Sequence, residues 1–314
     1  MANASAAATV WNCPNYLGEL FLIGANQTPF LNMIGGLEGA NAKVTRSFQF
    51  PIAQPWALEA ASQPDISETA SLSAPTPTTY VRGQDTNTVQ LFQEQISVSY
   101  AKLSVVGEIS GLSITGDQPV QNERDFQIAA NLKQIAIDAE YTFLQGTYQA
   151  ATDAGTSAKT RGIITATTTN AVAAGNAGLS KALIDQLLRT MAANGSVFDN
   201  PVVFCNAFQR QKFSNIYGYA PESRNVGGVS ISQVETDFAM LGIVWAPQMP
   251  TDTVLIADMS VISPVFLLVP ERGVLFYREL PSDGAAEKGM LYGQMGLDYG
   301  PEEYHGKITG LATS

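Results

Sequence analysis

The chain has 314 residues, which is enough for one large domain or two smaller ones with cores of their own. Only 14% of the residues are charged, against about 25% in soluble proteins generally. The deficit indicates a surface that neighbouring subunits cover, although a taxonomic bias in composition would have the same effect. The net charge of −11, with 17 basic residues scattered singly, disfavours tight nucleic-acid binding.

The two cysteines, Cys13 and Cys205, are far apart and show neither a metal-ligand spacing nor a redox spacing, so we expect reduced thiols. No apolar run approaches the roughly 18 residues that a membrane-spanning helix needs. Residues 1–10 lack the basic and apolar regions of a signal peptide. These features predict a soluble protein that is made in the cytoplasm and has no membrane partner.

Residues 1–43 are predicted to form an N-terminal arm. The stretch Tyr16–Ile23 has the spacing of a short amphipathic helix, and Pro29 and the pair Gly35 and Gly36 then interrupt regular structure. Because apolar side chains continue through this arm, it needs another surface on which to lie.

Residues 44–104 are predicted to form a long hairpin. Segments 44–50 and 95–100 alternate as strands do, and the proline-rich segment 51–87 between them shows no helical or strand period. Each half of such a hairpin could reach up to about 90 Å, whereas the radius of gyration of a compact chain of this length is about 20 Å. A projecting hairpin without a core cannot offset its ordering entropy, so either it is disordered or another subunit supplies the surface that it lacks. The apolar residues Trp56, Leu58 and Ile66 favour the second alternative.

The longest helix is predicted to begin at residues 122–124 and to end near Gly146, because one buried stripe recurs at helical spacing. The stripe consists of Ile128, Leu132, Ile135, Ala136, Ala139 and Phe143. A second helix follows the N-cap Ser180 and ends near Asn194, and a third covers 207–217. Strands are predicted at 163–164, 202–205, 229–234, 241–246, 253–257, 265–269, 274–278, 289–296 and 306–311. This order of elements is typical of the α+β class.

The sequence offers little for catalysis. His305 is the only histidine, so any triad would depend on it alone, and two glutamates beside it suggest a structural or surface role. Cys205 lies in an apolar strand, where a thiol is a small core residue. No metal-ligand, phosphate-loop or dinucleotide pattern occurs. We therefore expect no enzyme activity, no cofactor and no metal.

Five segments, in this order, resemble the major capsid proteins of tailed bacteriophages, whose Hong Kong-type fold also builds encapsulin shells and the floor of herpesvirus capsids. They are Gln27–Gly35, Val89–Ser99, Asp138–Gly146, Met249–Val254 and Glu303–Ile308. The resemblance implies an N-terminal arm over 1–43, an E-loop hairpin over 44–104, a peripheral domain with a spine helix over 105–150, an axial domain over 151–264, and C-terminal strands that return to the peripheral domain over 265–314.

The implied function is that of a structural subunit that self-assembles through pentamers and hexamers into an icosahedral phage head around double-stranded DNA. The implied partners are further copies of the chain, a separate scaffolding protein, a portal, decoration proteins, and DNA contacted weakly and without sequence specificity. The implied location is the virion, with assembly in the host cytoplasm. No lysine lies between Lys43 and Lys102, so the isopeptide bonds that some members of the family form from an E-loop lysine are not expected.

Two other classes compete with this interpretation. An encapsulin-type compartment would have the same fold around protein cargo, although the N-terminal arm resembles those of phage proteins instead. A tail-tube or adhesive β protein is disfavoured by the long predicted helices at 122–146 and 180–194.

The hairpin is the predicted contact between subunits. Its outer part is acidic, and we expect it to lie across a neighbouring subunit near basic residues of the long helix, with apolar anchors that provide most of the contact energy. The anchors are Trp56 and Leu58, the hairpin charges are Glu59, Asp65, Glu68, Asp85 and Arg82, and the basic partners are Arg124 and Lys133.

Overall fold

The computed structural model describes residues 27–35, 42–55, 61–80, 83–100, 123–217, 233–281 and 284–313. The helix expected over residues 16–23 lies outside these ranges. Among the helices described, none is both long and apolar enough to cross a membrane.

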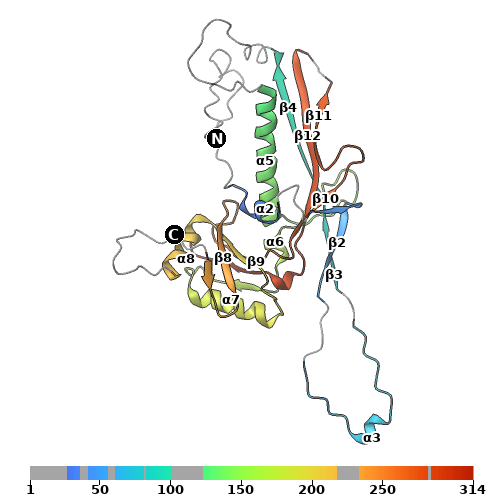
Figure 1. Cartoon of the computed structure of the whole chain (residues 1–314), viewed down its shortest axis with the longest axis vertical. Coiled ribbons are helices and arrows are strands. Elements are labelled where there is room, and N and C mark those ends of the chain that lie inside the picture. Colours follow the sequence, from blue (N-terminus) through green and yellow to red (C-terminus); the bar gives the residue numbers. More distant parts are fainter. Residues whose placement is uncertain are drawn as a thin grey trace.

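A first sheet forms the upper part of the molecule in Figure 1. The central strand is β12 (Ala286–Asp298). It pairs antiparallel with β4 (Gln90–Ser99) on one side and β11 (Leu275–Leu280) on the other, and its last residues pair with β10 (Ser263–Leu267). The short strand β1 (Lys43–Thr45) extends the sheet in parallel with β10.

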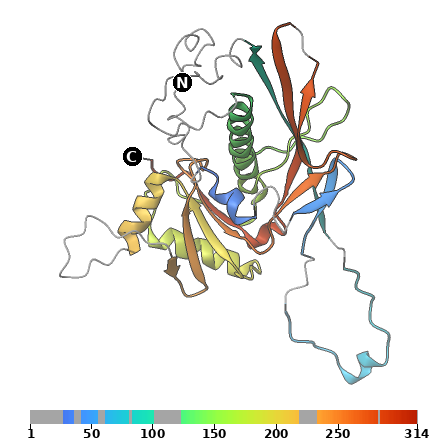
Figure 2. The ribbon, with the colours of Figure 1, turned by 45° about the horizontal axis from the view of Figure 1, so that its top comes forward.

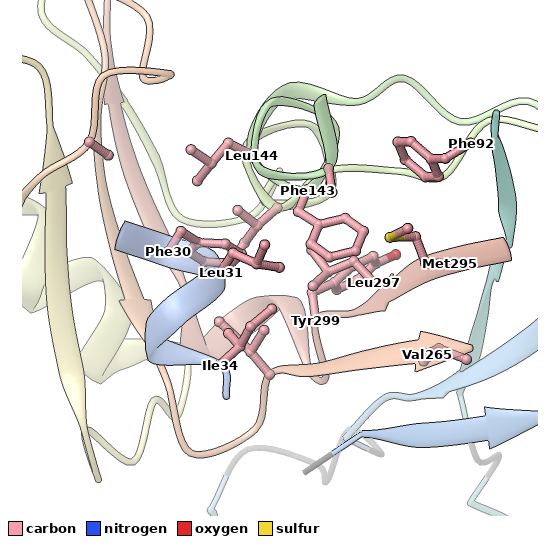
Figure 3. Close-up of a cluster of buried hydrophobic side chains, with 14 of the residues drawn as sticks. Phe30, Leu31, Ile34, Phe92, Phe143, Leu144, Val265, Met295, Leu297 and Tyr299 are labelled. Atoms are coloured by element: carbon pink, nitrogen blue, oxygen red, sulfur yellow. The ribbon is translucent and has the colours of Figure 1, made fainter. Parts of the chain in front are cut away.

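Helix α5 (Glu123–Gln145) covers one face of the first sheet, which confirms the long predicted helix. Alternate residues of β4 face it, because Phe92 and Ile96 are buried in the same core as Ile135 and Phe143 of the helix. Figure 3 shows this core around Phe143, Met295 and other labelled residues. The apolar face of β4 and the apolar stripe of α5 therefore bury each other.

A second sheet has the strand order β5, β13, β9, β6, β8, β7. Its strands are β5 (Ala171–Ala173), β6 (Pro201–Cys205), β7 (Gln233–Glu235), β8 (Met240–Trp245), β9 (Val254–Asp258) and β13 (Gly306–Thr309). Helices α7 (Lys181–Ala193) and α8 (Ala207–Tyr217) accompany it, both as predicted.

The centre of the second sheet is buried on both faces, as its strand β6 shows directly. Val203 and Cys205 belong to the core that contains the α7 side chains, whereas Val202 and Phe204 belong to the core that contains α5. A strand that is buried on both faces reads as a continuous apolar run, as Pro201–Cys205 does. The short helix α2 (Pro29–Met33) packs against α5 at the junction of the two sheets.

The hairpin projects from the body on the side opposite to the far end of the first sheet (Figures 1 and 2). Its paired strands are β2 (Gln49–Ala53) and β3 (Gln84–Thr88), and one helical turn, α3 (Glu68–Ser71), lies near its end. Strands β1 and β4, which the sequence-based division assigned to the hairpin, lie in the first sheet, because the apolar face of β4 is buried against α5.

Two further segments differ from expectation. Residues 163–164 were predicted as a strand, but they begin the short helix α6 (Ile163–Ala166), where Ile163 is fully buried and α6 packs on α5. Tertiary packing has here overridden the strand preference of two β-branched residues. The last strand, β13, follows the 3-10 helix η2 (Glu302–Tyr304) and pairs with β9 and β5. It therefore completes the second sheet, whereas the sequence-based division sent it back to the domain of the long helix.

Candidate assembly surfaces

The root of the hairpin is fixed to the body by Asn87, which is fully buried. Its Nδ2 donates to the carbonyl oxygens of Leu297 (2.7 Å) and Arg161 (3.1 Å). Its Oδ1 accepts from the backbone N–H groups of Thr88 (2.9 Å) and Arg161 (2.7 Å). Both donor hydrogens and both acceptor positions of the amide are therefore used.

A charged cluster beside Asn87 strengthens the same root. Arg161 Nη1 lies 2.5 Å from Asp85 Oδ2, and the Tyr299 hydroxyl donates to the same oxygen at 2.6 Å. The Arg161 guanidinium also lies over the Tyr148 ring, 4.8 Å from its centroid. Burial, followed by the hydrogen bond to Asp85, raises the pKa of Tyr299 far above its usual range, so this hydroxyl is a permanent donor.

The outer part of the hairpin, residues 61–80, has no such support. Every residue in it is exposed, including the apolar Ile66 (71%) and Leu72 (85%). Its only regular element is α3, which is capped by the Ser67 hydroxyl accepting from Ala70 N at 3.1 Å. Residues 61–80 contain Asp65 and Glu68 but no Lys or Arg, so this segment, which we call the hairpin tip, is acidic and apolar at once.

The structure places the predicted contact residues as follows. Asp65 and Glu68 lie exposed in the hairpin tip, whereas Asp85 lies at the root and is paired with Arg161. Trp56, Leu58, Glu59 and Arg82 lie outside the described residues.

The two basic residues expected to receive the tip differ in their surroundings. Arg124 contacts Glu279 (3.3 Å), Glu287 (3.7 Å) and Asp125 (3.9 Å) of its own subunit. Lys133 is exposed on α5. Both belong to α5, which lies above the hairpin in Figure 1, so one subunit does not bring them to its own tip.

The first sheet has a second face, opposite to α5, that sequence reasoning did not identify. Three neighbouring strands contribute to it, with three residues each. In register across the sheet, these are Gln93, Gln95 and Ser97 of β4, then Tyr292, Met290 and Lys288 of β12, then Phe276, Arg278 and Leu280 of β11. We call these nine residues the outer face. All of them are exposed or half-buried, and none is acidic.

The outer face is also rich in aromatic and amide groups. The Phe276 and Tyr292 rings have centroids 5.7 Å apart, and the Arg272 guanidinium lies 5.9 Å from the Phe276 ring. Glu279 of β11 and Glu287 of β12 point the other way, where they meet Arg124. The separation of charge between the two faces is encoded in the alternation of β11 and β12 and could have been found once their register was known.

His305 is a structural residue, because it is fully buried and both ring nitrogens are bonded. Its Nδ1 accepts from Asp258 N at 3.2 Å, and its Nε2 lies 2.6 Å from the carbonyl oxygen of Tyr299, which fixes the neutral Nε2–H tautomer. Burial lowers its pKa. Burial likewise raises the pKa of the Cys205 thiol to about 12, far from that of a nucleophile. Within the described ranges, no three His, Cys, Asp or Glu side chains gather as metal ligands would.

A two-sheet body with a long helix and an unsupported projecting hairpin defines the class of shell-forming capsid proteins, and the comparisons agree. The family model for the SU10 major capsid protein matches residues 3–312, so the chain belongs to that family. It is a structural capsid subunit, as the resemblance in the sequence had indicated. No curated protein matches its sequence significantly.

Solved structures show the same fold at low sequence identity. The capsid of cyanophage A-1(L) is 10% identical with a TM-score of 0.63, over 100% of this chain and 98% of that chain. The capsid of a native GTA particle is 14% identical with a TM-score of 0.59, over 93% and 92%. The SrpI encapsulin of Synechococcus elongatus PCC 7942 is 9% identical with a TM-score of 0.53, over 96% of each chain.

Proposed function

We propose that the chain assembles through pentamers and hexamers into an icosahedral phage head that encloses double-stranded DNA, and that the hairpin of each subunit clamps a neighbour. The observation that carries this proposal is the hairpin tip, which exposes Ile66 and Leu72 on a rigidly rooted support. Exposed apolar side chains that no core of the same chain covers are typical of contact surfaces. Assembly in the host cytoplasm with a separate scaffolding protein, a portal and decoration proteins belongs to the same proposal.

The domains have corresponding roles in this proposal. The first sheet with α5 would form the peripheral domain and the second sheet would form the axial domain at the centre of each capsomer. DNA would be contacted weakly, because the net charge is −11 and the basic residues are scattered.

The outer face is the better receptor for the hairpin tip than the long helix. The tip carries carboxylates without a cation, and the exposed cation Arg278 lies on the outer face. Arg124, in contrast, already faces the carboxylates of Glu279, Glu287 and Asp125, so a fourth carboxylate would meet net repulsion there. Lys133 belongs to α5, on the other side of the first sheet from the outer face, so it would take no part in this contact.

Sedimentation and negative-stain microscopy of the purified chain test the main proposal. We expect capsomers or closed shells. A stable 33.4 kDa monomer at high protein concentration would contradict it.

A charge swap tests the receptor. Arg278→Glu should slow assembly at low salt, and Glu68→Arg in the same chain should restore part of the rate, because rim charges act mainly on association. The matched control is Arg189→Glu, which makes the same change at an exposed position of α7. If Arg278→Glu and Arg189→Glu assemble at the same rate, the tip docks elsewhere. That result would leave the proposal of a shell unchanged.

An encapsulin-type compartment is the second candidate, supported by the fold shared with the SrpI encapsulin over 96% of each chain. Nuclease-protected DNA inside particles isolated from the natural source would favour the phage head, and protein cargo would favour the compartment.

A further inference from the structure

Glu140 is a fully buried carboxylate on α5 that bonds to a distant part of the chain. Its Oε1 accepts from the backbone N–H of Phe30 at 3.0 Å, and its Oε2 accepts from that of Leu31 at 2.6 Å. Both donors belong to α2, about 110 positions earlier in the sequence. One side chain of the long helix therefore holds the N-terminal segment through both of its oxygens.

These two bonds complete the N-terminus of α2. The N-cap residue Thr28 makes no side-chain capping bond, and Pro29 has no N–H to satisfy. The N–H of Asn32 bonds to the carbonyl oxygen of Thr28 at 3.1 Å. The N–H groups of Phe30 and Leu31 are thus the ones that need an acceptor, and Glu140 supplies the cap that the local sequence lacks.

The surroundings of Glu140 are apolar. One turn away on α5 lie Ala136, Ile137, Phe143 and Leu144, and α2 itself carries no titratable side chain. On the far side of α2, the Phe30 ring packs edge-on against Phe204 with centroids 5.2 Å apart. Among the described residues, no cation forms an ion pair with this carboxylate. Figure 3 shows Phe30 and Leu31 packed beside Phe143 and Leu144.

We propose that Glu140 is a proton-sensitive latch that fastens the N-terminal segment at α2 to the long helix. A latch of this kind sets where the segment leaves the body, and it lies at the junction of the two sheets. Its release would expose Phe30, Leu31 and Ile34, which are now buried. The proposal concerns the single subunit and does not depend on which shell the subunit builds.

The sign of the proton dependence follows from burial. In the docked state, desolvation raises the pKa of Glu140 from 4.5 to about 7, although the bonds from Leu31 and Phe30 pull the pKa down. With α2 undocked, the carboxyl group meets water and its pKa returns toward 4.5. Docking therefore takes up a proton between these two values, so it is tightest below pH 4.5 and weakens as the pH rises through 7. From pH 6 to pH 8 the docking constant should fall about tenfold.

Hydrogen exchange of the full chain, read by mass spectrometry on a peptide covering residues 27–35, tests this latch. After correction for intrinsic exchange rates, its protection should be about tenfold lower at pH 8 than at pH 6. The α7 peptide, residues 181–193, should stay unchanged and thereby reports the fold of the body. Equal protection of residues 27–35 at both pH values in the wild-type chain would overturn the proposal.

Two variants separate the latch from general stability. Glu140→Gln cannot ionise and still offers one acceptor, so residues 27–35 should stay protected with a flat pH profile. Glu140→Ala leaves both N–H groups without an acceptor, so protection should be lost at both pH values while α7 stays protected. A pH dependence that persists in Glu140→Gln would show that another group titrates. Particle formation in the same samples, followed by microscopy, tests the shell independently.

Discussion

The two ends of the hairpin follow opposite physical rules. At the root, Asn87 uses all of its hydrogen-bonding capacity, Asp85 and Arg161 neutralise each other, and the Tyr299 hydroxyl donates to Asp85. At the tip, twenty consecutive positions, 61–80, are exposed, and large apolar side chains contact no core. A region whose polar groups and apolar side chains find their partners within the same chain contributes to folding. A region whose side chains find no such partners can gain them only from another chain. The comparison therefore predicts that root variants change stability and tip variants change assembly.

The largest effect is expected at Asn87. Asn87→Ala would leave two backbone N–H groups and two carbonyl oxygens without their partner in a buried site, so the free energy of unfolding should fall by about 3 kcal/mol. Urea denaturation followed by circular dichroism measures this. Thr69→Ala in the tip is the control and should leave the midpoint unchanged. A similar loss in both variants would break the distinction between root and tip.

Next in size is the effect of Trp56→Ala on assembly. If Trp56 is an aromatic anchor, its removal should weaken the contact between subunits by about 2 kcal/mol, which raises the critical concentration for assembly about thirtyfold. Light scattering across a concentration series measures it. Unaltered assembly, or a loss of folded body in circular dichroism, would show that Trp56 is not a contact between subunits.

A smaller effect is expected at Leu72, the most exposed of the tip's apolar residues. Leu72→Ser should leave thermal unfolding of the subunit unchanged and raise the critical concentration roughly fivefold, because it removes about 1 kcal/mol of apolar contact. The matched control is Val197→Ser, an exposed apolar residue of the body. If the two substitutions raised the critical concentration equally, the tip would be no more important for assembly than another exposed apolar position.

We expect no covalent bond between subunits through the hairpin. Because no lysine lies between Lys43 and Lys102, shells boiled in denaturant with reductant should run as single chains on a gel. A ladder of multimers would mean that another pair of side chains joins the subunits.

The parts of this fold that local sequence determines were predictable. The stripe on α5, the Ser180 cap of α7 and the apolar run of β6 each carry their own signal, and each forms where expected except at one position. Leu132, which was predicted to belong to the buried stripe, is exposed. Residues 163–164 show the limit, because their strand preference is overridden by burial against a helix. The periodicity of apolar residues predicts the type of a single helix or strand, but it does not predict which other element packs against it.

The candidate surfaces were predictable only in part. The acidic character of the tip follows from Asp65 and Glu68 directly. The outer face required the register of β11 on β12, and the Glu140 cap joins positions about 110 residues apart. Neither leaves a local pattern, because both depend on which distant segments become neighbours.

Strand β12 gives the subunit a continuous path for mechanical load. It runs from the far end of the first sheet to Leu297, whose carbonyl oxygen is held by Asn87 at the hairpin root. Its backbone then continues to Tyr299, which contacts both Asp85 of the hairpin and His305 ahead of β13. Tension applied to the hairpin would therefore pass into the strand ladders of both sheets, where many hydrogen bonds share it. A shell built from such subunits would resist internal pressure by distributing stretch along β12, without relying on any single contact.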